Sequence, residues 1–317
     1  MSFQIWTEKY RPDGLDEVVG QKHVVERLKA WVKDKSMANM IFAGPPGSGK
    51  TSCSIAMAKE LFGKNWHQNF QETNSSDERG IDVVRGRIKE FARSKPIGAD
   101  FKIIFLDESD NLTSDAQQAL RRTMERFSDA ARFILSCNYS TRLIEPVASR
   151  CAVFRFRRLE PKDVERYLQR IVDGEKLKID KDATDAIVEI SNGDLRKATN
   201  LLQVCATRDK ITRDVVYEIA SQARPKDVAG MLEHAQKGDF PGARKLLYDM
   251  LINQGLAAED IVRSIHTELF NLKIDDKYRL KLVERLGEYE FRLNQGATPE
   301  IQLEAFLAGF LEIPKAK

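Results

Sequence analysis

The chain has 317 residues, of which 42% are hydrophobic and 31% are charged, and its formal net charge is +3. This is the balance of a soluble globular protein of two or three domains. No apolar run approaches membrane-spanning length, and the N-terminus lacks a secretory pattern, so we expect an intracellular protein. The small net charge means that nucleic-acid binding would require a local basic patch. The four cysteines form no C-x-x-C pair, which argues against a zinc module or a disulfide framework.

The first twenty residues predict an extended lead-in, because Pro12 and Gly14 interrupt regular structure. A helix is predicted over about residues 21–33, where apolar side chains recur on one face. The lead-in can supply an apolar slot for a nucleotide base, or it can simply pack as an N-terminal arm. Composition supports both interpretations equally.

A phosphate-binding loop follows an apolar run at residues 40–43. It reads Gly44-Pro45-Pro46-Gly47-Ser48-Gly49-Lys50-Thr51. This matches G-x-x-x-x-G-K-[ST], and a helical pattern to about residue 61 follows it, so the motif has its required strand–turn–helix setting. Glycines allow successive backbone N–H groups to face phosphate oxygens. Lys50 would neutralise the β- and γ-phosphate oxygens, and Thr51 would offer its hydroxyl to Mg²⁺. A chance glycine-rich turn is the alternative.

A strand is predicted over residues 70–74, and a helix capped by Ser75-Ser76-Asp77 over about residues 81–93. On this helix three cations share one face, since they are spaced four residues apart: Arg85, Lys89 and Arg93. Such a row can follow a phosphate backbone. The residue pattern alone favours a solvated helix face.

A buried strand over residues 101–106 ends in Asp107 and Glu108. After a phosphate-binding loop, this pair predicts the second half of a nucleotide site: Asp107 would hold Mg²⁺, and Glu108 would deprotonate the attacking water. A helix over residues 114–127 and a strand over residues 132–137 follow. Asn138 comes at the end of that strand, where open parallel sheets bind ligands, although such an asparagine is often only a turn residue.

Ser149-Arg150-Cys151 precedes a last strand over residues 152–156, and Pro161 marks a break. Helical periodicity continues from there to the end of the chain. Three or four short helices are predicted over residues 162–224, one of them starting within Gly193-Asp194-Leu195-Arg196-Lys197-Ala198, and some five over residues 226–317.

These motifs, taken in order, resemble those of the AAA+ ATPases. Tyr10-Arg11-Pro12, the acidic box Asp107-Glu108-Ser109-Asp110 and Ser149-Arg150-Cys151 narrow the resemblance to clamp-loader ATPases, specifically the archaeal type of the replication factor C small-subunit family. The resemblance covers essentially the whole chain. It implies an α/β fold: a P-loop AAA+ parallel-sheet ATPase domain (1–160), a small helical lid domain carrying the second sensor (161–225) and an all-α collar domain for oligomerisation (226–317).

The resemblance also implies roles for individual residues. Glu108 would be the catalytic base, Asn138 the first sensor and Arg196 the second sensor. Arg150 would be an arginine finger that enters the neighbouring subunit's site. Thr51 and Asp107 would support Mg²⁺, and Arg85 and Lys89 would contact the DNA backbone. The implied nucleotide-binding residues are Gly44, Pro45, Pro46, Gly47, Ser48, Gly49, Lys50, Thr51, Ser52, Tyr10, Arg11, Val18, Val19, Asn138 and Arg196.

The implied function is ATP- and Mg²⁺-dependent loading of a sliding clamp onto primer–template DNA during replication. The implied partners are other small subunits, a large clamp-loader subunit, the clamp and the DNA, in the cytoplasm for an archaeal protein or in the nucleus for a eukaryotic one. Ser109 replaces an alanine common in relatives, a change that we expect to be tolerated. Two alternatives are a nucleotide-binding scaffold that does not hydrolyse ATP, and another AAA+ motor such as an unfoldase or helicase. Unfoldases of this type carry an aromatic pore loop between the two nucleotide motifs, and none is evident between Thr51 and Asp107.

Overall fold

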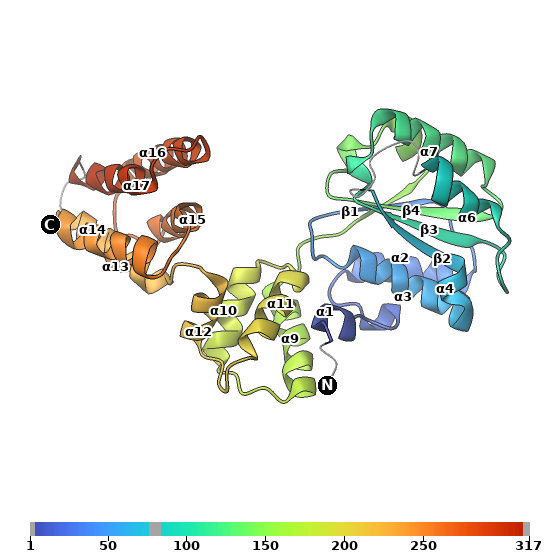
Figure 1. Ribbon diagram of the computed structural model, residues 1–317, viewed down its shortest axis with the longest axis horizontal. Helices are drawn as coiled ribbons and strands as arrows, with labels where there is room; N and C mark the ends of the chain where they lie inside the picture. The colour runs from blue at the N-terminus through green and yellow to red at the C-terminus, as the bar shows by residue number, and fades with distance from the viewer. Residues whose placement is uncertain (1–3, 76–83, 313–317) are drawn as a thin grey trace. The chain divides into compact units, whose positions relative to one another are not determined.

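The computed structural model describes residues 4–75 and 84–312 (Figure 1). By its internal contacts, the chain divides into two compact units. The first unit takes in Met1–Leu177 and Ile187–Gln203, and the second takes in Lys178–Ala186 and Val204–Lys317. The three domains expected from the sequence, with boundaries near residues 160 and 225, stay a prediction.

A sheet of five parallel strands forms the centre of the first unit, in the order β2-β3-β4-β1-β5. The strands are β1 (Met40–Ala43), β2 (Phe70–Asn74), β3 (Lys102–Asp107), β4 (Ala131–Cys137) and β5 (Ala152–Arg155). Almost every residue of β1, β3 and β4 is buried, as expected for parallel strands covered on both faces. Ala43 pairs with Cys137, so β1 and β4 end side by side.

Helices cover both faces of this sheet (Figure 1). One face carries α2 (Lys22–Lys33), α3 (Lys50–Phe62) and α4 (Trp66–Asn69), and the other carries α6 (Lys89–Arg93) and α7 (Ser114–Arg126). Side chains alternate along β1. Met40 and Phe42 pack in the hydrophobic core on the side of α2 and α3, and Ile41 and Ala43 pack in the core on the side of α7. Strand β1, which leads into the glycine-rich loop, is therefore held by packing from both sides.

The predicted helix over residues 21–33 is confirmed as α2, and the predicted strand over residues 70–74 is confirmed as β2. The expected helix from residue 81 is only partly described: Ser76, Asp77 and residues 81–83 lie outside the described residues, and a π-helical turn, η3 (Val84–Ile88), leads into α6. Short helical turns complete this part of the unit: η2 (Gly63–Asn65), η4 (Ser109–Asn111), η5 (Ser140–Arg142) and α8 (Glu145–Ala148).

The prediction of an extended lead-in is wrong. The segment contains a short helix, α1 (Trp6–Lys9), and a 3-10 turn, η1 (Leu15–Glu17). Leu15 is fully buried in the core, and its backbone N–H donates to the Glu60 carboxylate at 2.6 Å. These contacts with α3 stabilise a turn that the local sequence, with Pro12 and Gly14, does not favour.

Four helices follow the sheet: α9 (Pro161–Glu175), α10 (Lys181–Ser191), α11 (Leu195–Cys205) and α12 (Arg213–Ala220). Pro161 occupies the first turn of α9, where its missing N–H leaves no hydrogen bond unmade. The break predicted at this proline is thus the start of a helix.

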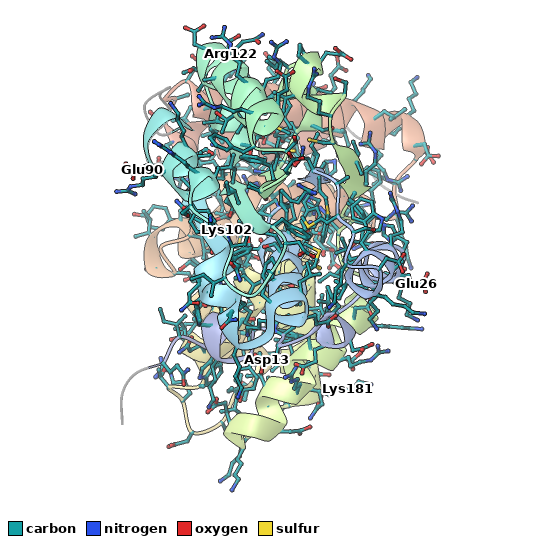
Figure 2. All side chains as sticks on the ribbon, turned by 90° about the vertical axis from the view of Figure 1, so that its right-hand side faces the viewer. Asp13, Glu26, Glu90, Lys102, Arg122 and Lys181 are labelled. Atoms are coloured by element: carbon teal, nitrogen blue, oxygen red, sulfur yellow. The ribbon has the colours of Figure 1, made fainter. Side chains whose placement is uncertain are left out.

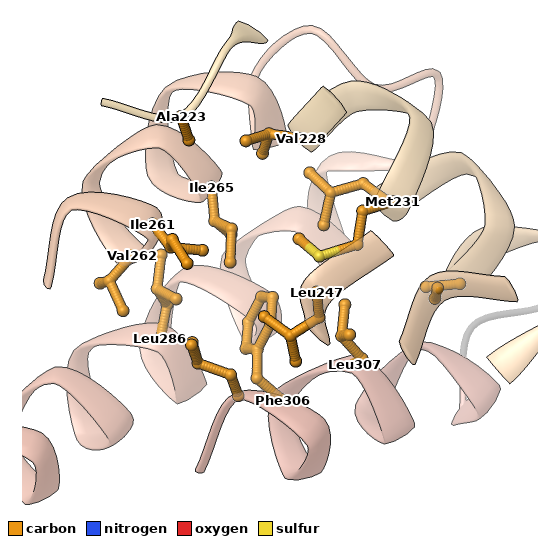
Figure 3. Packing of buried hydrophobic residues seen from close by; sticks show 14 of the residues in the cluster. Ala223, Val228, Met231, Leu247, Ile261, Val262, Ile265, Leu286, Phe306 and Leu307 are labelled. Carbon is orange, nitrogen blue, oxygen red and sulfur yellow. The ribbon is translucent and has the colours of Figure 1, made fainter. Parts of the chain in front are cut away.

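The C-terminal part of the second unit contains the five predicted helices: α13 (Pro225–Gln236), α14 (Phe240–Tyr248), α15 (Ala258–Leu269), α16 (Asp276–Asn294) and α17 (Pro299–Ala308), with the turns η6 (Asp249–Asn253) and η7 (Gly309–Glu312). Their apolar stripes meet in one core, in which Met231, Leu247, Ile265 and Phe306 are almost fully buried (Figure 3). Among the described helices, none is both long and apolar enough to cross a membrane.

Candidate nucleotide-binding site

A cavity of about 250 Å³ lies at the carboxyl ends of β1, β3 and β4, within the first unit. Most of the predicted nucleotide-site residues line it: Arg11, Val18, Val19, Pro46, Gly47, Ser48, Gly49, Lys50, Thr51, Ser52, Asp107, Glu108, Asn138 and Arg196. The fold thus brings together the N-terminal arm, the phosphate-binding loop, two strand ends and the start of α11.

Lys50 holds the phosphate-binding loop in shape. Its ammonium donates to the carbonyl oxygens of Gly44 at 2.6 Å and Pro45 at 2.9 Å, and it lies 3.4 Å from Asn138 Oδ1. Gly44 and Pro45 do not line the cavity but supply these acceptors. The loop therefore has a defined conformation formed by its own contacts.

Gly47 shows why the loop needs a glycine at this position. Its φ angle is +64°, and a Cβ there would lie 1.8 Å from the Asp194 carboxylate. The backbone N–H of Leu195 also donates to the Gly47 carbonyl oxygen at 3.2 Å. The N-terminal end of α11 therefore lies directly against the loop, which brings Arg196 to the cavity.

The lysine environment favours an anion. Lys50 is only 9% exposed, and burial lowers its pKa, while the nearby Asp107 carboxylate acts in the opposite direction. Burial disfavours a charged ammonium unless an opposite charge compensates it. A phosphate group in the loop would supply that charge.

The residues that would hold Mg²⁺ fit that ion. The Thr51 hydroxyl donates to Asp107 Oδ2 at 3.5 Å, so two oxygen ligands already lie together beside the loop. Mg²⁺ prefers oxygen ligands and commonly takes only one or two from the protein, with phosphate and water completing the shell.

Glu108 directly follows this site, with its backbone in the left-handed region at φ +51°. Its carboxylate accepts a hydrogen bond from the Asn111 side chain at 3.1 Å. The next residue of the acidic box, Ser109, is fully buried, and its hydroxyl donates to the Leu106 carbonyl oxygen at 2.7 Å. The departure from alanine at Ser109 is accommodated because the buried hydroxyl has an acceptor.

Tyr10 lies outside the cavity lining, unlike Arg11. Its buried hydroxyl donates to Glu175 Oε1 on α9 at 2.8 Å. Burial, together with this hydrogen bond, raises the pKa of Tyr10 to about 12. Tyr10 therefore attaches the N-terminal arm to α9, and its predicted place in the base slot is not supported by the cavity lining.

Several lining residues were missed from the sequence: Thr7, Glu8, Pro12, Glu17, Ser136, Cys137, Tyr167, Leu195 and Thr199. Ser136 and Cys137 directly precede Asn138 and could have been found from the end of β4. The Ser136 hydroxyl is buried without a hydrogen-bond partner in the described part of the chain, as expected for a group that meets a ligand or water. Tyr167 and Thr199 come from α9 and α11 and carry no motif.

Two predicted residues lie elsewhere on the first unit. Arg150 is exposed, and its guanidinium contacts Glu125 Oε1 at 2.7 Å. Lys89 lines a separate groove between α6 and α7 together with Arg122 and Arg126, and Arg122 projects outward from α7 (Figure 2). The Arg85 side chain lies outside the described residues.

Three family models match the chain. The model described as "ATPase family associated with various cellular activities (AAA)" matches residues 40–159, and the "RCF1/5-like, AAA+ ATPase lid domain" matches residues 166–207. The "Replication factor C C-terminal domain" matches residues 223–309.

A solved structure of the RuvB Holliday junction branch migration motor of Thermotoga maritima is 20% identical, with a TM-score of 0.55 over 79% of this chain and 87% of that one. This likeness supports the AAA+ fold alone. Curated relatives show much higher sequence identity over nearly the whole chain. The replication factor C small subunit of Methanocella arvoryzae is 52% identical over 97% of this chain and 96% of its own length. That of Archaeoglobus fulgidus is 51% identical over 97% of each. The chain belongs to the replication factor C small-subunit family, the AAA+ ATPases that load clamps in DNA replication.

Proposed function

We propose that this clamp-loader chain hydrolyses ATP in a site completed by Arg150 of a neighbouring subunit. One observation carries the proposal: the cavity of the chain contains Lys50, Glu108 and Asn138, whereas Arg150 is exposed on the surface and lines no part of it. An exposed arginine can serve a site on another molecule. An arginine supplied in this way stabilises transition-state charge and accelerates hydrolysis by about 10³–10⁵.

The residues of the cavity suit phosphoryl transfer to water. Lys50 and the loop N–H groups would bind the phosphates, and Glu108 would orient the attacking water and accept its proton. Thr51 and Asp107 would hold Mg²⁺, which neutralises charge on the phosphate oxygens when bound. In phosphoryl transfer, positioning and charge stabilisation supply most of the catalysis.

Arg196 and Asn138 would report the state of the nucleotide. Asn138 lies beside Lys50, directly after the end of β4, where the γ-phosphate of a bound ATP would lie. Arg196 reaches the same cavity from α11, whose first turn contacts Gly47. Loss of the γ-phosphate would therefore remove a partner from both the strand end and the helix.

The other partners follow from the family and the surface charge. We propose an assembly of several small subunits with one large subunit, acting on a sliding clamp and primer–template DNA. Lys89, with Arg122 and Arg126 in the same groove, supports a path for the DNA backbone, and Arg85 would extend it. Phosphate contacts carry no base information, so we expect no sequence preference.

The test mixes two inactive chains. Glu108→Gln removes the base but keeps the finger, and Arg150→Ala removes the finger but keeps the base. Each chain alone should lose ATP turnover, and a one-to-one mixture should regain part of it, with stimulation by primer–template DNA. The matched control is Arg155→Ala, an exposed arginine on β5 that should leave turnover unchanged. If mixing restores nothing, Arg150 does not act in a neighbour's site.

A further inference from the structure

The Arg150 side chain has partners within its own chain. Its guanidinium contacts Glu125 Oε1 at 2.7 Å through one nitrogen and donates to the Pro146 carbonyl oxygen at 2.7 Å through the other. Arg150 and Glu125 are both exposed, with relative side-chain accessibilities of 39% and 41%. The pair can therefore separate without exposing a buried charge.

Helix stability does not explain why an acid stands at position 125. Glu125 lies in the last turn of α7, where the negative end of the helix dipole disfavours a carboxylate. Within the helix it has Arg121 four residues earlier, at 3.8 Å, in the less favourable order with the cation first. Its short contact is the one with Arg150, which lies outside the helix, in the turn between α8 and β5.

The backbone around Arg150 is attached to the core, whereas its side chain is exposed. The Arg150 N–H donates to the Val147 carbonyl oxygen at 3.2 Å, and Val147 is fully buried in the core that α7 also helps to form. Cys151 packs against the same core. The Arg150 guanidinium, on a long side chain with several rotatable bonds, is the part that can exchange one anionic partner for another.

We propose that Glu125 is a positioning residue that retains Arg150 on its own chain until a neighbouring site offers a stronger anion. This rests on the proposed role of Arg150 in the neighbouring site. While it is paired, the charge of Arg150 is compensated and cannot act on a phosphate. A γ-phosphate carries more negative charge than one carboxylate, so ATP in the neighbouring site competes for the guanidinium more strongly than ADP.

The experiment assigns each role to a separate chain. The donor carries Glu108→Gln, so it offers Arg150 but cannot hydrolyse ATP. The acceptor carries Arg150→Ala, so it hydrolyses ATP only with a donor's arginine. ATP turnover of one-to-one mixtures, without DNA, is compared between this donor and one that also carries Glu125→Gln. The matched control donor carries Glu26→Gln, which changes another exposed helical glutamate of the first unit.

Freeing Arg150 should raise turnover in the mixture about two- to fivefold, the range allowed by the free energy of an exposed ion pair. The ratio between the two donors should fall towards one as salt is added, because salt screens the pair in the parent donor. Glu26→Gln should change nothing. Placing Glu125→Gln in the acceptor should also change nothing, because that chain has no Arg150 to release.

Two results would overturn the proposal. One is a mixture with the Glu125→Gln donor whose ATP turnover is no higher than that with the parent donor, and the other is an equal rise in turnover when Glu125→Gln is placed in the acceptor. The first would mean that the ion pair does not restrain Arg150, and the second that any effect arises elsewhere. A parent donor that gives no rescue at all would instead overturn the shared site itself, so the two failures are distinguishable.

Discussion

At the scale of single residues, the first unit uses a carboxylate on α9 to hold the N-terminal arm. Glu175 accepts hydrogen bonds from Lys9 at 2.6 Å and from the Tyr10 hydroxyl at 2.8 Å. Gly174 permits this approach, because a Cβ there would lie 2.4 Å from the Tyr10 hydroxyl oxygen. The arm carries Arg11, Val18 and Val19 into the nucleotide cavity, so its attachment sets one wall of the site.

The attachment should depend on pH. The hydrogen bond from Lys9 is the main reason that the pKa of Glu175 lies below its usual 4.5. A depressed pKa in the folded state means that the stabilisation is present above pH 4.5 and is lost as the pH falls below it. The pKa of Tyr10 is shifted upward, so its contribution to stability depends on pH in the opposite direction. The Tyr10 hydroxyl keeps donating up to pH 10 and loses this role as the pH rises towards about 12.

The Glu175→Gln variant should therefore unfold at a lower urea concentration than the wild type at pH 7. At pH 3 the two proteins should have similar urea midpoints. The measurement is urea unfolding of both proteins across this range. Glu165→Gln, an exposed glutamate on the same helix, is the control and should follow the wild type throughout. A constant difference between Glu175→Gln and the wild type at every pH would contradict the role of the Glu175 charge.

At the scale of elements, a buried side chain can hold a loop by hydrogen-bonding to loop backbone groups that have no partner in a helix or strand. Asn69, the last residue of α4, is fully buried. Its amide donates to the Ile97 carbonyl oxygen at 2.8 Å, and its carbonyl oxygen accepts from the Ile97 N–H at 2.9 Å. Asn69 thereby fixes the loop between α6 and β3, the strand that carries Asp107.

Asn69→Ala should destabilise the first unit by about 1–3 kcal/mol, because it leaves backbone groups of Ile97 without partners. Guanidinium unfolding measures the loss. Gln68→Ala, at the exposed neighbouring position, should have little effect. If both variants unfold like the wild type, water satisfies Ile97 and the loop does not depend on Asn69.

Elements with a continuous local signal were predictable from the sequence. The apolar runs before Asp107 and Asn138 predicted β3 and β4 to within one residue at their starts, because each strand contains a continuous apolar stretch, residues 103–106 in β3 and residues 133–135 in β4, as expected for strands buried on both faces. The lead-in was misjudged because its turns depend on distant partners such as Glu60. Tyr167 and Thr199 were missed for the same reason: only the tertiary fold brings α9 and α11 to the cavity.

At the scale of the whole molecule, the C-terminal helices of the second unit have a hydrophobic core of their own, distinct from the two cores on the faces of the sheet. The core of the C-terminal helices is built around aromatic contacts: the Phe306 ring lies 6.2 Å from that of Tyr289 and 5.7 Å from that of Phe310 (Figure 3 shows Phe306 within the cluster). None of its members belongs to the cores that cover the sheet. We therefore expect the second unit to lose stability without loss of the nucleotide site.

Phe306→Ala should destabilise the second unit by about 3–5 kcal/mol, because it leaves a cavity in a closed core. In calorimetry, one unfolding transition should move to lower temperature, and binding of a fluorescent ATP analogue below that temperature should be unchanged. Ile301→Ala, which is 62% exposed on the same helix, provides the control. Transitions that move together would show that the units unfold as one.

The two outer strands of the sheet bear on how copies of this chain can meet. β2 and β5 are the outermost strands of the described sheet, with five and four residues. β2 exposes Glu72 and β5 exposes Arg155, and short strands with charged side chains are poor templates for further strand pairing. Copies of this chain that lie close together would thus be protected from joining their sheets into a continuous ribbon. In the proposed assembly, contacts between copies would therefore be made by helices and loops, which can separate and re-form without disrupting a sheet.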